Sequence, residues 1–571
     1  MNRVVFALCV LFLAANGIVF AESVAKDADY LNADPKSLEW WRQARFGLFL
    51  HWGPVSLSGQ EISWSRGGVR LGLPTNDPNW GNLANNERTG IPIEEYDNLY
   101  KRFDPVKFNA RELVALAKAA GMGYIVLTSK HHDGFCMFDS EYTDYDIMAG
   151  PYGKDICKQL ADACHEAGMR LGWYYSPPDW HHPDYYTDRH YRYIRYLHNQ
   201  VRELLTNYGK VDIMWFDGLM CTADKLHSDT LYKTIRKLQP GILINNRLAL
   251  PGDFDTPEQT IGRFQNQRPW ESCITIGDQW SWRPNDRTKS LKQCISTLVQ
   301  CAGGDGNLLF NVGPKSDGSI EPDQVDRLRN MGVWLRKYGE SIYGTRGGPF
   351  ILSHVGASTY SGNKIYIHVL DWQGNVLTLP AIPAKIVRCR ALTGGAASCV
   401  QDENGIRIDL GKTARNEIDT IIVIELDRPA SEIKPVSVAS GLLSVDKPAK
   451  ASNVFRGMKE FGPDKALDGN DGTRWATDDG VSPAWLEVDL AKPQTFRRVI
   501  ISEALDRVRK FELLCRDSDA QEWRVFHTGT TIGDDLKLDI PLVTARYVRL
   551  NIIEAPGGPT VWEFQVQNPP R

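Results

Sequence analysis

Carboxylate side chains are the first candidates for chemistry in this chain, and Asp217 is the strongest of them. It directly follows the apolar run Val211–Phe216, so a strand would hold its carboxylate with little room to move. An aspartate at such a position usually caps a helix or forms a turn, but the polar residues expected around Asp217 favour a functional role. Hydrolysis of a glycosidic bond requires two carboxyl groups, one on each side of that bond. We therefore predict Asp217 as one member of such a pair.

Two glutamates compete for the second carboxyl position. Glu258 lies in a segment punctuated by Pro and Gly, where a mobile loop is expected. Glu271 directly precedes a predicted strand, which would place it at the opposite end of a parallel sheet. We predict Glu258 as the acid/base and keep Glu271 as its rival.

Three histidines form the next group of candidates: His51, His131 and His132. Together with Asp133, the adjacent pair could suggest a zinc hydrolase. Adjacent residues of a strand point to opposite faces, however, and the sequence has no HExxH spacing. Neutral histidines that bind sugar hydroxyls fit better, because ligand pockets use a few polar groups of this kind. We therefore predict no cofactor for catalysis.

Apolar runs and helical patterns alternate between about residues 40 and 340. The predicted strands are Phe46–His51, Tyr124–Ser129, Leu171–Ser176, Val211–Phe216, Ile242–Asn246, Cys273–Ile276 and Asn307–Val312. The predicted helices are Arg111–Ala120, Ile156–Ala167, Tyr191–Tyr208, Leu231–Leu238, Leu291–Cys301 and Gln324–Tyr338. This alternation predicts a (β/α)8-like (TIM-type) barrel. An open doubly wound sheet is the alternative, but no Gly-rich nucleotide turn follows the first strand.

Polar clusters at the ends of these strands support the barrel. They include His51-Trp52-Gly53, Lys130-His131-His132-Asp133, Tyr174-Tyr175-Ser176, Trp215-Phe216-Asp217 and Asn245-Asn246-Arg247. The carboxyl ends of barrel strands meet at one rim, where barrel enzymes build their active sites. We expect these clusters to meet there.

Two all-β regions follow the barrel, because helical periodicity ends near residue 345. The predicted divisions are a signal peptide (1–21), the catalytic barrel (22–344), a small antiparallel β-sandwich (345–430) and a second β-sandwich (441–567). The fold class is thus multidomain α/β plus all-β. Cys389 and Cys399 flank a Gly-rich turn and could form a disulfide bond.

The N-terminus predicts export. Arg3 precedes an apolar run over residues 4–15, and Val19-Phe20-Ala21 resembles a cleavage site. We expect a periplasmic or secreted protein with no membrane span after cleavage. The net charge of −4 argues against nucleic acid as a partner. The sequence leaves the oligomeric state open.

Four long motifs together resemble the α-L-fucosidases of glycoside hydrolase family 29. They are Arg45-Phe46-Gly47-Leu48-Phe49-Leu50-His51-Trp52-Gly53-Pro54, Leu127-Thr128-Ser129-Lys130-His131-His132-Asp133-Gly134-Phe135-Cys136, Trp215-Phe216-Asp217-Gly218 and Gly306-Asn307-Leu308-Leu309-Phe310-Asn311-Val312-Gly313-Pro314. The resemblance implies exo-acting removal of terminal α-L-fucose with retention of configuration. It also implies a fucosylated oligosaccharide or glycoconjugate as the substrate.

The same resemblance implies roles for individual residues. Asp217 matches the nucleophile, and Glu258 best matches the acid/base. The implied substrate-binding residues are His51, His131, His132, Tyr174, Trp215, Arg247, Trp280, Glu61 and Trp64. The Thr-Pro-Glu-Gln block slightly favours the members restricted to α-1,3/1,4-linked fucose.

Residues 441–567 resemble the discoidin-like (F5/8 type C) modules of carbohydrate-binding family 32. The matching motifs are Ala466-Leu467-Asp468-Gly469-Asn470, Thr473-Arg474-Trp475 and Val561-Trp562-Glu563-Phe564. Such modules usually hold a structural Ca²⁺, which here would lie near Asp468, Asp471, Thr473 and Glu563. The stretch after Ser502 is short, so an architectural role is as well supported as glycan binding.

Two alternatives to a glycoside hydrolase with two catalytic carboxyl groups remain at this point. One is a non-catalytic carbohydrate-binding or adhesion protein, although Asp217 and Glu258 are both intact. The other is metal-dependent hydrolysis by the histidine pair.

Overall fold

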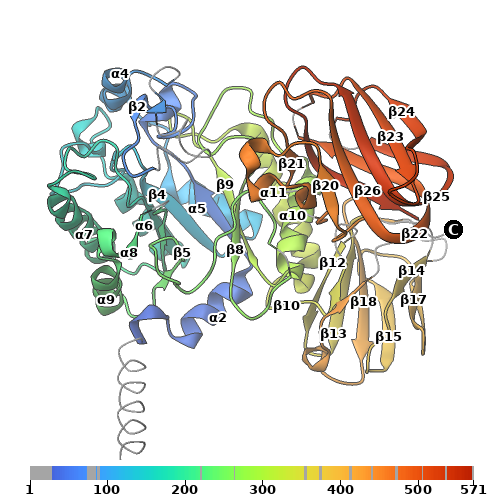
Figure 1. Ribbon diagram of the computed structural model, residues 1–571. Coiled ribbons are helices and arrows are strands. Elements are labelled where there is room, and N and C mark those ends of the chain that lie inside the picture. The colour runs from blue at the N-terminus through green and yellow to red at the C-terminus, as the bar shows by residue number, and fades with distance from the viewer. Residues whose placement is uncertain are drawn as a thin grey trace, which may run out of the picture. The chain divides into compact units, whose positions relative to one another are not determined.

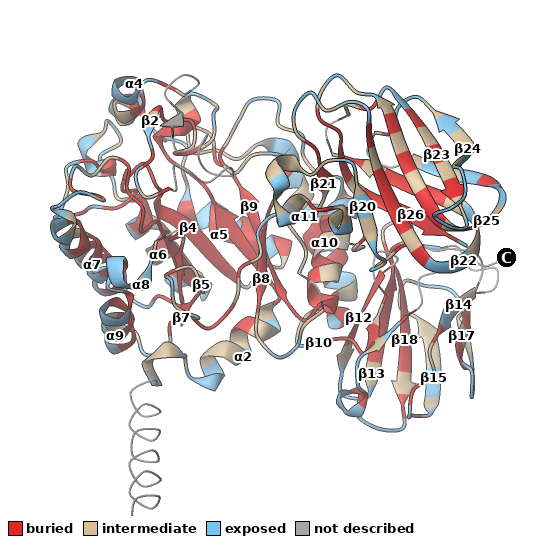
Figure 2. Cartoon of the chain, viewed as in Figure 1, coloured by how far each residue is buried: buried red, intermediate tan, exposed pale blue. Residues whose placement is uncertain are grey.

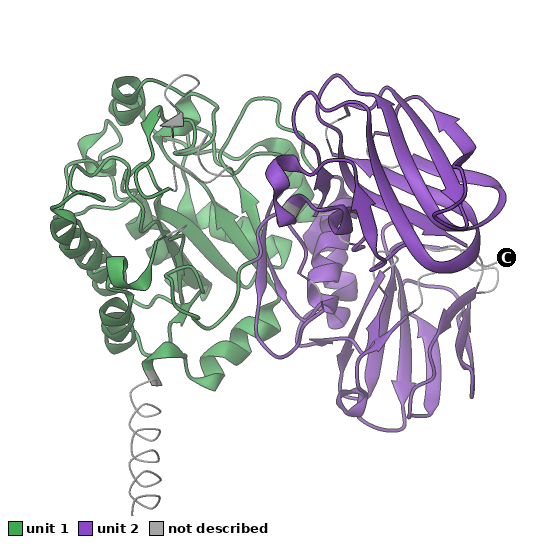
Figure 3. Cartoon of the chain, in the orientation of Figure 1, with its two compact units in different colours: residues 1–256, 277–288, 310–329 green, residues 257–276, 289–309, 330–571 purple. Residues whose placement is uncertain are grey.

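The computed structural model describes residues 29–73, 85–86, 90–218, 221–262, 264–352, 356–371, 376–410, 415–438, 442–469, 473–504, 506–533 and 536–568. The predicted signal peptide and Asp471 lie outside these ranges. Within them, no helix combines the length and apolarity needed to cross a membrane. The chain divides into two compact units (Figure 3). Unit 1 comprises residues 1–256, 277–288 and 310–329, and unit 2 comprises residues 257–276, 289–309 and 330–571.

A seven-stranded sheet positions the candidate site, with the strand order β7-β6-β5-β4-β1-β9-β8. Its strands are β1 (Phe46–Leu50), β4 (Tyr124–Lys130), β5 (Arg170–Tyr175), β6 (Ile213–Phe216), β7 (Leu243–Ile244), β8 (Glu271–Thr275) and β9 (Asn307–Val312). The strand pairs β1–β4, β4–β5, β5–β6 and β6–β7 are all parallel. In the first pair, for example, Leu48 of β1 lies opposite Ile125 of β4. Every residue of β4 and β9 is buried, as Figure 2 shows. Parallel sheets with both faces covered have this burial pattern.

Helices alternate with these strands. They are α2 (Pro35–Ala44), α4 (Ile93–Asp97), α5 (Ala110–Ala120), α6 (Ile156–Ala167), α7 (His190–Thr206), α8 (Ala223–Leu226), α9 (Ser228–Leu238), α10 (Leu291–Gly303) and α11 (Pro322–Tyr338). In Figure 1, α7 and α9 lie outside the strands. Local signals set the helix ends: the Asn109 side chain accepts from the Glu112 N–H at the start of α5, and Gly121 ends that helix at φ 87°. The alternation confirms the predicted (β/α)8-like class.

The described residues contain seven strands of this sheet, whereas a regular barrel has eight. The segment between β7 and β8 forms isolated parallel bridges instead. Phe254 bridges Asn245, which directly follows β7, and Glu258 bridges Cys273 of β8. This segment therefore occupies the place in the chain where an eighth strand is expected.

A small antiparallel β region follows the barrel and contains two sheets, β10-β12-β13-β18-β15 and β14-β17-β16. The strands are β10 (Arg346–Gly347), β12 (Gly356–Ser361), β13 (Lys364–Val369), β14 (Val376–Leu379), β15 (Ile386–Ala391), β16 (Ser398–Asp402), β17 (Gly405–Asp409) and β18 (Thr420–Leu426). Ile367, Ile408 and Ile422 belong to its core. The suggested disulfide between Cys389 and Cys399 is present and joins β15 to β16.

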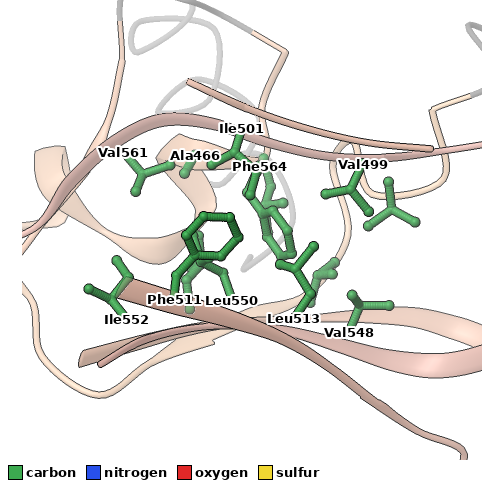
Figure 4. Packing of buried hydrophobic residues seen from close by; sticks show 14 of the residues in the cluster. Ala466, Val499, Ile501, Phe511, Leu513, Val548, Leu550, Ile552, Val561 and Phe564 are labelled. Atoms are coloured by element: carbon green, nitrogen blue, oxygen red, sulfur yellow. The ribbon is translucent and has the colours of Figure 1, made fainter. Parts of the chain in front are cut away.

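The C-terminal region is a second β-sandwich, as predicted. Its strands are β20 (Ala449–Ala451), β21 (Trp475–Ala476), β22 (Ala484–Glu503), β23 (Lys510–Arg516), β24 (Arg524–Gly529), β25 (Leu536–Glu554) and β26 (Thr560–Gln567). Figure 4 shows Val499, Ile501 and Phe564 on one side of the core and Leu513 and Leu550 on the other. The exact domain boundaries at residues 344, 430 and 441 stay predictions.

Candidate active site

Asp217 lies directly after β6, and both of its carboxylate oxygens have donors. Its Oδ1 accepts a hydrogen bond from Arg247 Nη1 at 3.1 Å, and its Oδ2 accepts one from the Tyr174 hydroxyl at 3.0 Å. The side chain is 13% exposed. The two donors orient the carboxylate. Asp217 therefore has the fixed position and accessibility that a nucleophile needs.

Arg247 is itself fixed by Thr256. Arg247 Nε donates to Thr256 Oγ1 and Nη2 donates to the Thr256 carbonyl, both at 2.8 Å. The Arg247 carbonyl accepts from the Gly218 N–H at 2.8 Å, and a Cβ at residue 218 would lie 2.3 Å from that oxygen. Glycine is therefore required directly after Asp217.

His51 is held in one tautomer by Asn311 on β9. The Asn311 amide donates to the Trp280 carbonyl at 2.7 Å, so its Oδ1 faces His51 Nδ1, also at 2.7 Å. In the neutral imidazole, Nδ1 must then carry the proton and Nε2 must be an acceptor. His51 thus presents a hydrogen-bond acceptor, which suits a sugar hydroxyl.

The expectation that His131 and His132 point to opposite faces is wrong. β4 ends at Lys130, so strand alternation does not apply to the turn that follows. The two rings lie 4.1 Å apart between centroids, and both are buried. His131 Nδ1 lies 2.6 Å from Ser63 Oγ, and His132 Nδ1 lies 2.6 Å from Ser176 Oγ. Both histidines therefore belong to the Asp217 site, with His132 Nε2 at 3.6 Å from Asp217 Oδ2.

Burial keeps these imidazoles neutral. It lowers the pKa of His51 and of His132 to about 3, and it also lowers the pKa of His131. Neighbouring positive charges, including Lys130 and Arg247, add to the effect on the His132 pKa. Neutral rings can accept hydrogen bonds from hydroxyl groups at any pH near neutrality.

We expect this burial to make the protein less stable at mildly acidic pH. In the unfolded chain His51 and His132 take up protons as the pH falls below about 6.5, whereas in the folded state they resist protonation down to about 3. Each should therefore lower the free energy of unfolding by about 1.4 kcal/mol per pH unit across that window. Urea unfolding at pH 7.0, 6.0 and 5.0 measures the slope. His132→Asn should make it shallower, and an unchanged slope would contradict the assignment.

Glu61 fixes the segment that carries Trp280. Its Oε2 accepts from the Trp280 N–H at 2.9 Å, and its Oε1 accepts from the Ser281 N–H at 3.0 Å. The half-buried Trp280 ring lies 4.7 Å from the His51 ring. Glu61 therefore positions Trp280. Any further contact of Glu61 with a sugar remains a prediction.

Two other tryptophans differ in accessibility. Trp215 is 1% exposed, because the Tyr174 ring stacks on it at 5.5 Å and Arg247 lies 4.8 Å from it. Trp64 is half-buried, with its ring 5.7 Å from His132. Trp64 and Trp280 thus offer more ring surface to a ligand than Trp215 does.

Sequence reasoning missed the buried ion pair between Lys130 and Asp179. Lys130 Nζ lies 2.9 Å from Asp179 Oδ2, with the two side chains 0% and 2% exposed. Lys130 directly precedes His131, while the next residue after Asp179, Trp180, donates its N–H to the His132 carbonyl. The pair therefore joins the two segments that hold His132. Lys130 appeared in the polar cluster after its strand, but no local signal identified Asp179.

The two candidate acid/base residues have different environments. Glu258 is exposed. It lies two residues after Thr256, whose carbonyl accepts a hydrogen bond from Arg247. Glu271 is 0% exposed and begins β8, at the amino end of the strand. Asp217 follows the carboxyl end of its strand, which is the end where barrel sites form. These environments favour Glu258.

One group in the described residues has the spacing of a metal site: His131, His132 and Asp217, whose ligand atoms lie within 4.8 Å of one another. The Arg247 guanidinium already contacts Asp217. A metal cation there would be repelled by this positive charge, so the residues do not fit a metal.

In the C-terminal module, Thr473 Oγ1 donates to Asp468 Oδ1 at 2.8 Å. Calcium binding by Asp468, Asp471, Thr473 and Glu563 stays a prediction.

Two regions of the chain match known protein families. Residues 13–340 match the family described as alpha-L-fucosidase, and residues 448–564 match the F5/8 type C domain. Human plasma alpha-L-fucosidase is 30% identical over 346 residues, which cover 56% of this chain and 72% of the relative. Alpha-L-fucosidase isoenzyme 1 from Paenibacillus thiaminolyticus has a TM-score of 0.61 and 33% identity, covering 69% of this chain and 99% of that one.

A second solved structure bears on the reaction. It is a GH29 alpha-L-fucosidase from Bacteroides thetaiotaomicron, described as a trapped covalent intermediate with 2-fluoro-fucosyl fluoride. It has a TM-score of 0.59 and 26% identity, covering 69% of this chain and 97% of that one.

Proposed function

This chain belongs to the α-L-fucosidase family of glycoside hydrolases, and from that premise we propose that it is an exo-acting, retaining enzyme in which Asp217 is the nucleophile and Glu258 the acid/base. The observation that carries the proposal is the Asp217 carboxylate, oriented by Arg247 and Tyr174 among three buried histidines. The covalent intermediate described for the Bacteroides thetaiotaomicron relative supports retention.

The reaction proceeds by double displacement. Asp217 attacks C1 of the fucosyl unit, and Glu258 donates its proton to the leaving oxygen as the glycosidic bond breaks. Glu258 then removes a proton from water, which attacks C1 and releases fucose and the Asp217 carboxylate. Retaining enzymes of this kind have carboxyl groups about 5–5.5 Å apart. This separation is what we expect for Asp217 and Glu258 in the substrate complex.

Chain connectivity supports Glu258 as the partner of Asp217. Arg247 contacts both Asp217 and Thr256. Two residues span at most about 7 Å, so Glu258 starts close to the contact that holds the nucleophile. The side chain is exposed, which allows proton exchange with water. Buried Glu271 lacks this access.

The remaining residues bind the sugar. His51 and His132 accept hydrogen bonds from its hydroxyl groups through Nε2, since Asn311 and Ser176 occupy their Nδ1 atoms. The Trp280 ring packs against the C6 methyl group of fucose, a role that its greater accessibility favours over Trp215. These contacts would hold a single terminal fucose, which is the basis of the proposed exo action.

The acid/base assignment is tested with two leaving groups. We expect Glu258→Gln to lower kcat/KM for a fucosylated oligosaccharide by about 10²–10⁴-fold, the scale of general acid catalysis. The loss for 4-nitrophenyl α-L-fucoside should be much smaller, because 4-nitrophenolate leaves without a proton. Glu271→Gln is the matched control and should affect both substrates alike. If Glu271→Gln gives the leaving-group dependence instead, the roles are reversed.

The same assay addresses linkage. We propose the group restricted to α-1,3/1,4-linked fucose, on the Thr256-Pro257-Glu258-Gln259 block. Release from a branched Lewis-type oligosaccharide but not from the aryl fucoside supports this group, and release from both identifies a broad enzyme. In the restricted case, α-L-fucosyl fluoride, whose fluoride is bonded to C1 of fucose and leaves without a full proton transfer, replaces the aryl fucoside in the acid/base test.

We also propose that the protein is exported to the periplasm or secreted. The disulfide between Cys389 and Cys399 supports this, since disulfides persist in oxidising compartments. The predicted signal peptide and the plasma location in the human relative's name agree with it.

A further inference from the structure

An arginine in the C-terminal module is held between aromatic rings without a charged partner. The guanidinium carbon of Arg474 lies 5.0 Å from the Phe461 ring centroid and 5.0 Å from the Trp562 ring centroid. No hydrogen bond or ion pair joins its guanidinium to any other residue that the structure describes. We call Phe461, Arg474 and Trp562 the Arg474 clamp.

The strand register explains how the clamp forms. β21 and β26 pair antiparallel, with Trp475 opposite Val561. The next pair along this register places Arg474 opposite Trp562. Trp475 and Val561 are both 0% exposed and face the core. Because side chains alternate along β26, Trp562 faces away from the core, and Arg474, which directly precedes β21, lies against its ring. β21 and β26 lie side by side in Figure 1.

A second arginine extends this patch of positive charge. The guanidinium carbon of Arg456 lies 4.9 Å from the Phe455 ring, which meets the Phe461 ring edge to face at 5.5 Å. Asp478 is the nearby carboxylate, and it accepts the backbone N–H of Arg456 at 2.7 Å. The two guanidinium groups and the two phenylalanine rings thus form a continuous row.

Two other stacked arginines of the module, Arg546 and Arg549, differ because carboxylates neutralise them. Arg546 lies 4.9 Å from the Tyr547 ring and pairs with Asp489 at 2.8 Å. Arg549 lies 4.1 Å from the Trp485 ring and pairs with Glu487 at 2.7 Å. Stacking on an aromatic ring is therefore common in this module, whereas Arg474 lies against two rings and has no carboxylate partner among the described residues.

We propose that the Arg474 clamp binds an acidic saccharide, with the guanidinium on its carboxylate or sulfate group and the aromatic rings against its sugar ring. A guanidinium offers a planar fork of N–H donors that matches these anions. Aromatic faces suit the C–H face of a sugar ring. The site lies in the C-terminal module, outside the Asp217 site, and its binding is independent of fucosidase activity.

The test measures binding of the full chain to three immobilised polymers that display galactose, galacturonic acid or galactose 6-sulfate. We expect at least about tenfold tighter binding to an acidic polymer than to the galactose polymer. The two acidic polymers distinguish carboxylate from sulfate as the preferred group. Raising NaCl from 50 to 500 mM should weaken this binding, since exposed charges are screened by salt.

Arg474→Gln should remove the preference for the acidic polymers, and Arg474→Lys should give an intermediate affinity. Arg546→Gln is the matched control, because it removes a stacked but neutralised arginine, and it should bind as the unaltered chain does. Thermal unfolding checks that the variants fold. If Arg474→Gln fails to fold, competition by free galactose 6-sulfate against free galactose gives the same comparison. Equal binding of all three polymers, no binding of an acidic polymer, or unaltered binding by Arg474→Gln would overturn the proposal.

Discussion

Replacing Asp217 with glycine should lower kcat for an α-L-fucoside by at least about 10⁴-fold, the scale on which removal of a nucleophile acts in other hydrolases. The loss is this large because Asp217 is the carboxylate that Arg247 and Tyr174 orient for attack on C1. Sugar binding should persist, since the three histidines and Trp280 do not depend on the carboxylate. Steady-state kinetics and fucose binding by calorimetry measure the two effects.

Azide distinguishes a nucleophile from a structural residue at this position. In Asp217→Gly, azide can enter the space left by the carboxylate and attack C1 from the same face. The product should be β-L-fucosyl azide, with the leaving group expelled and its oxygen protonated by Glu258. Asp212, an ion-paired carboxylate on the preceding turn, gives a control variant, Asp212→Asn, that should retain turnover. The assignment would be contradicted if Asp217→Gly failed to fold. It would also be contradicted if azide restored turnover but the product contained no azide.

Replacing Lys130 with methionine should lower the free energy of unfolding by about 3–5 kcal/mol, the cost of leaving a buried charge without its partner. Asp179 would keep only the N–H groups of His181 and His182 as donors. The Lys130 Nζ also lies 4.5 Å from the Tyr175 ring, so its replacement removes a cation–π contact. Urea denaturation measures the change.

The double variant Lys130→Met/Asp179→Leu separates charge burial from packing. It should recover most of the lost stability, because neither partner then leaves an unpaired charge. Its KM for an α-L-fucoside should nevertheless be higher than that of the unaltered chain, because the ion pair joins the two segments that hold His132. Lys158→Met is the matched control. It breaks an exposed pair with Asp162 and should change stability little. A double variant as unstable as the single one would show that the ion pair is not the source of the effect.

Local patterns in the sequence determined most of the secondary structure. The predicted strand Asn307–Val312 and helix Ile156–Ala167 agree residue for residue with β9 and α6. Both are encoded by consecutive residues: an apolar run in the strand, and an amphipathic pattern between Asp155 and Gly168 in the helix. The position of Asp217 after its strand could be predicted for the same reason, because the run before it is short and apolar.

Contacts between distant segments could not be predicted in this way. The tautomer of His51 depends on Asn311, which is 260 residues away, and the fixed position of Trp280 depends on Glu61, 219 residues earlier. The pairing of Lys130 with Asp179 depends on how two turns pack. None of these partners has a periodicity or a motif of its own, so no window of sequence identifies it.

The motifs thus determined the family, the strand that carries Asp217, and the residue types around it. Tertiary structure decided how those residues act. It ended β4 at Lys130, so the alternation of side chains along a strand does not apply to His131 and His132. Both rings therefore lie near Asp217. It buried Glu271 and left Glu258 exposed, and among the described residues it gave Arg474 no carboxylate partner. The physical reason is that secondary structure follows from interactions between near neighbours in sequence. The burial, tautomer and charge of a side chain instead depend on what the folded chain brings against it.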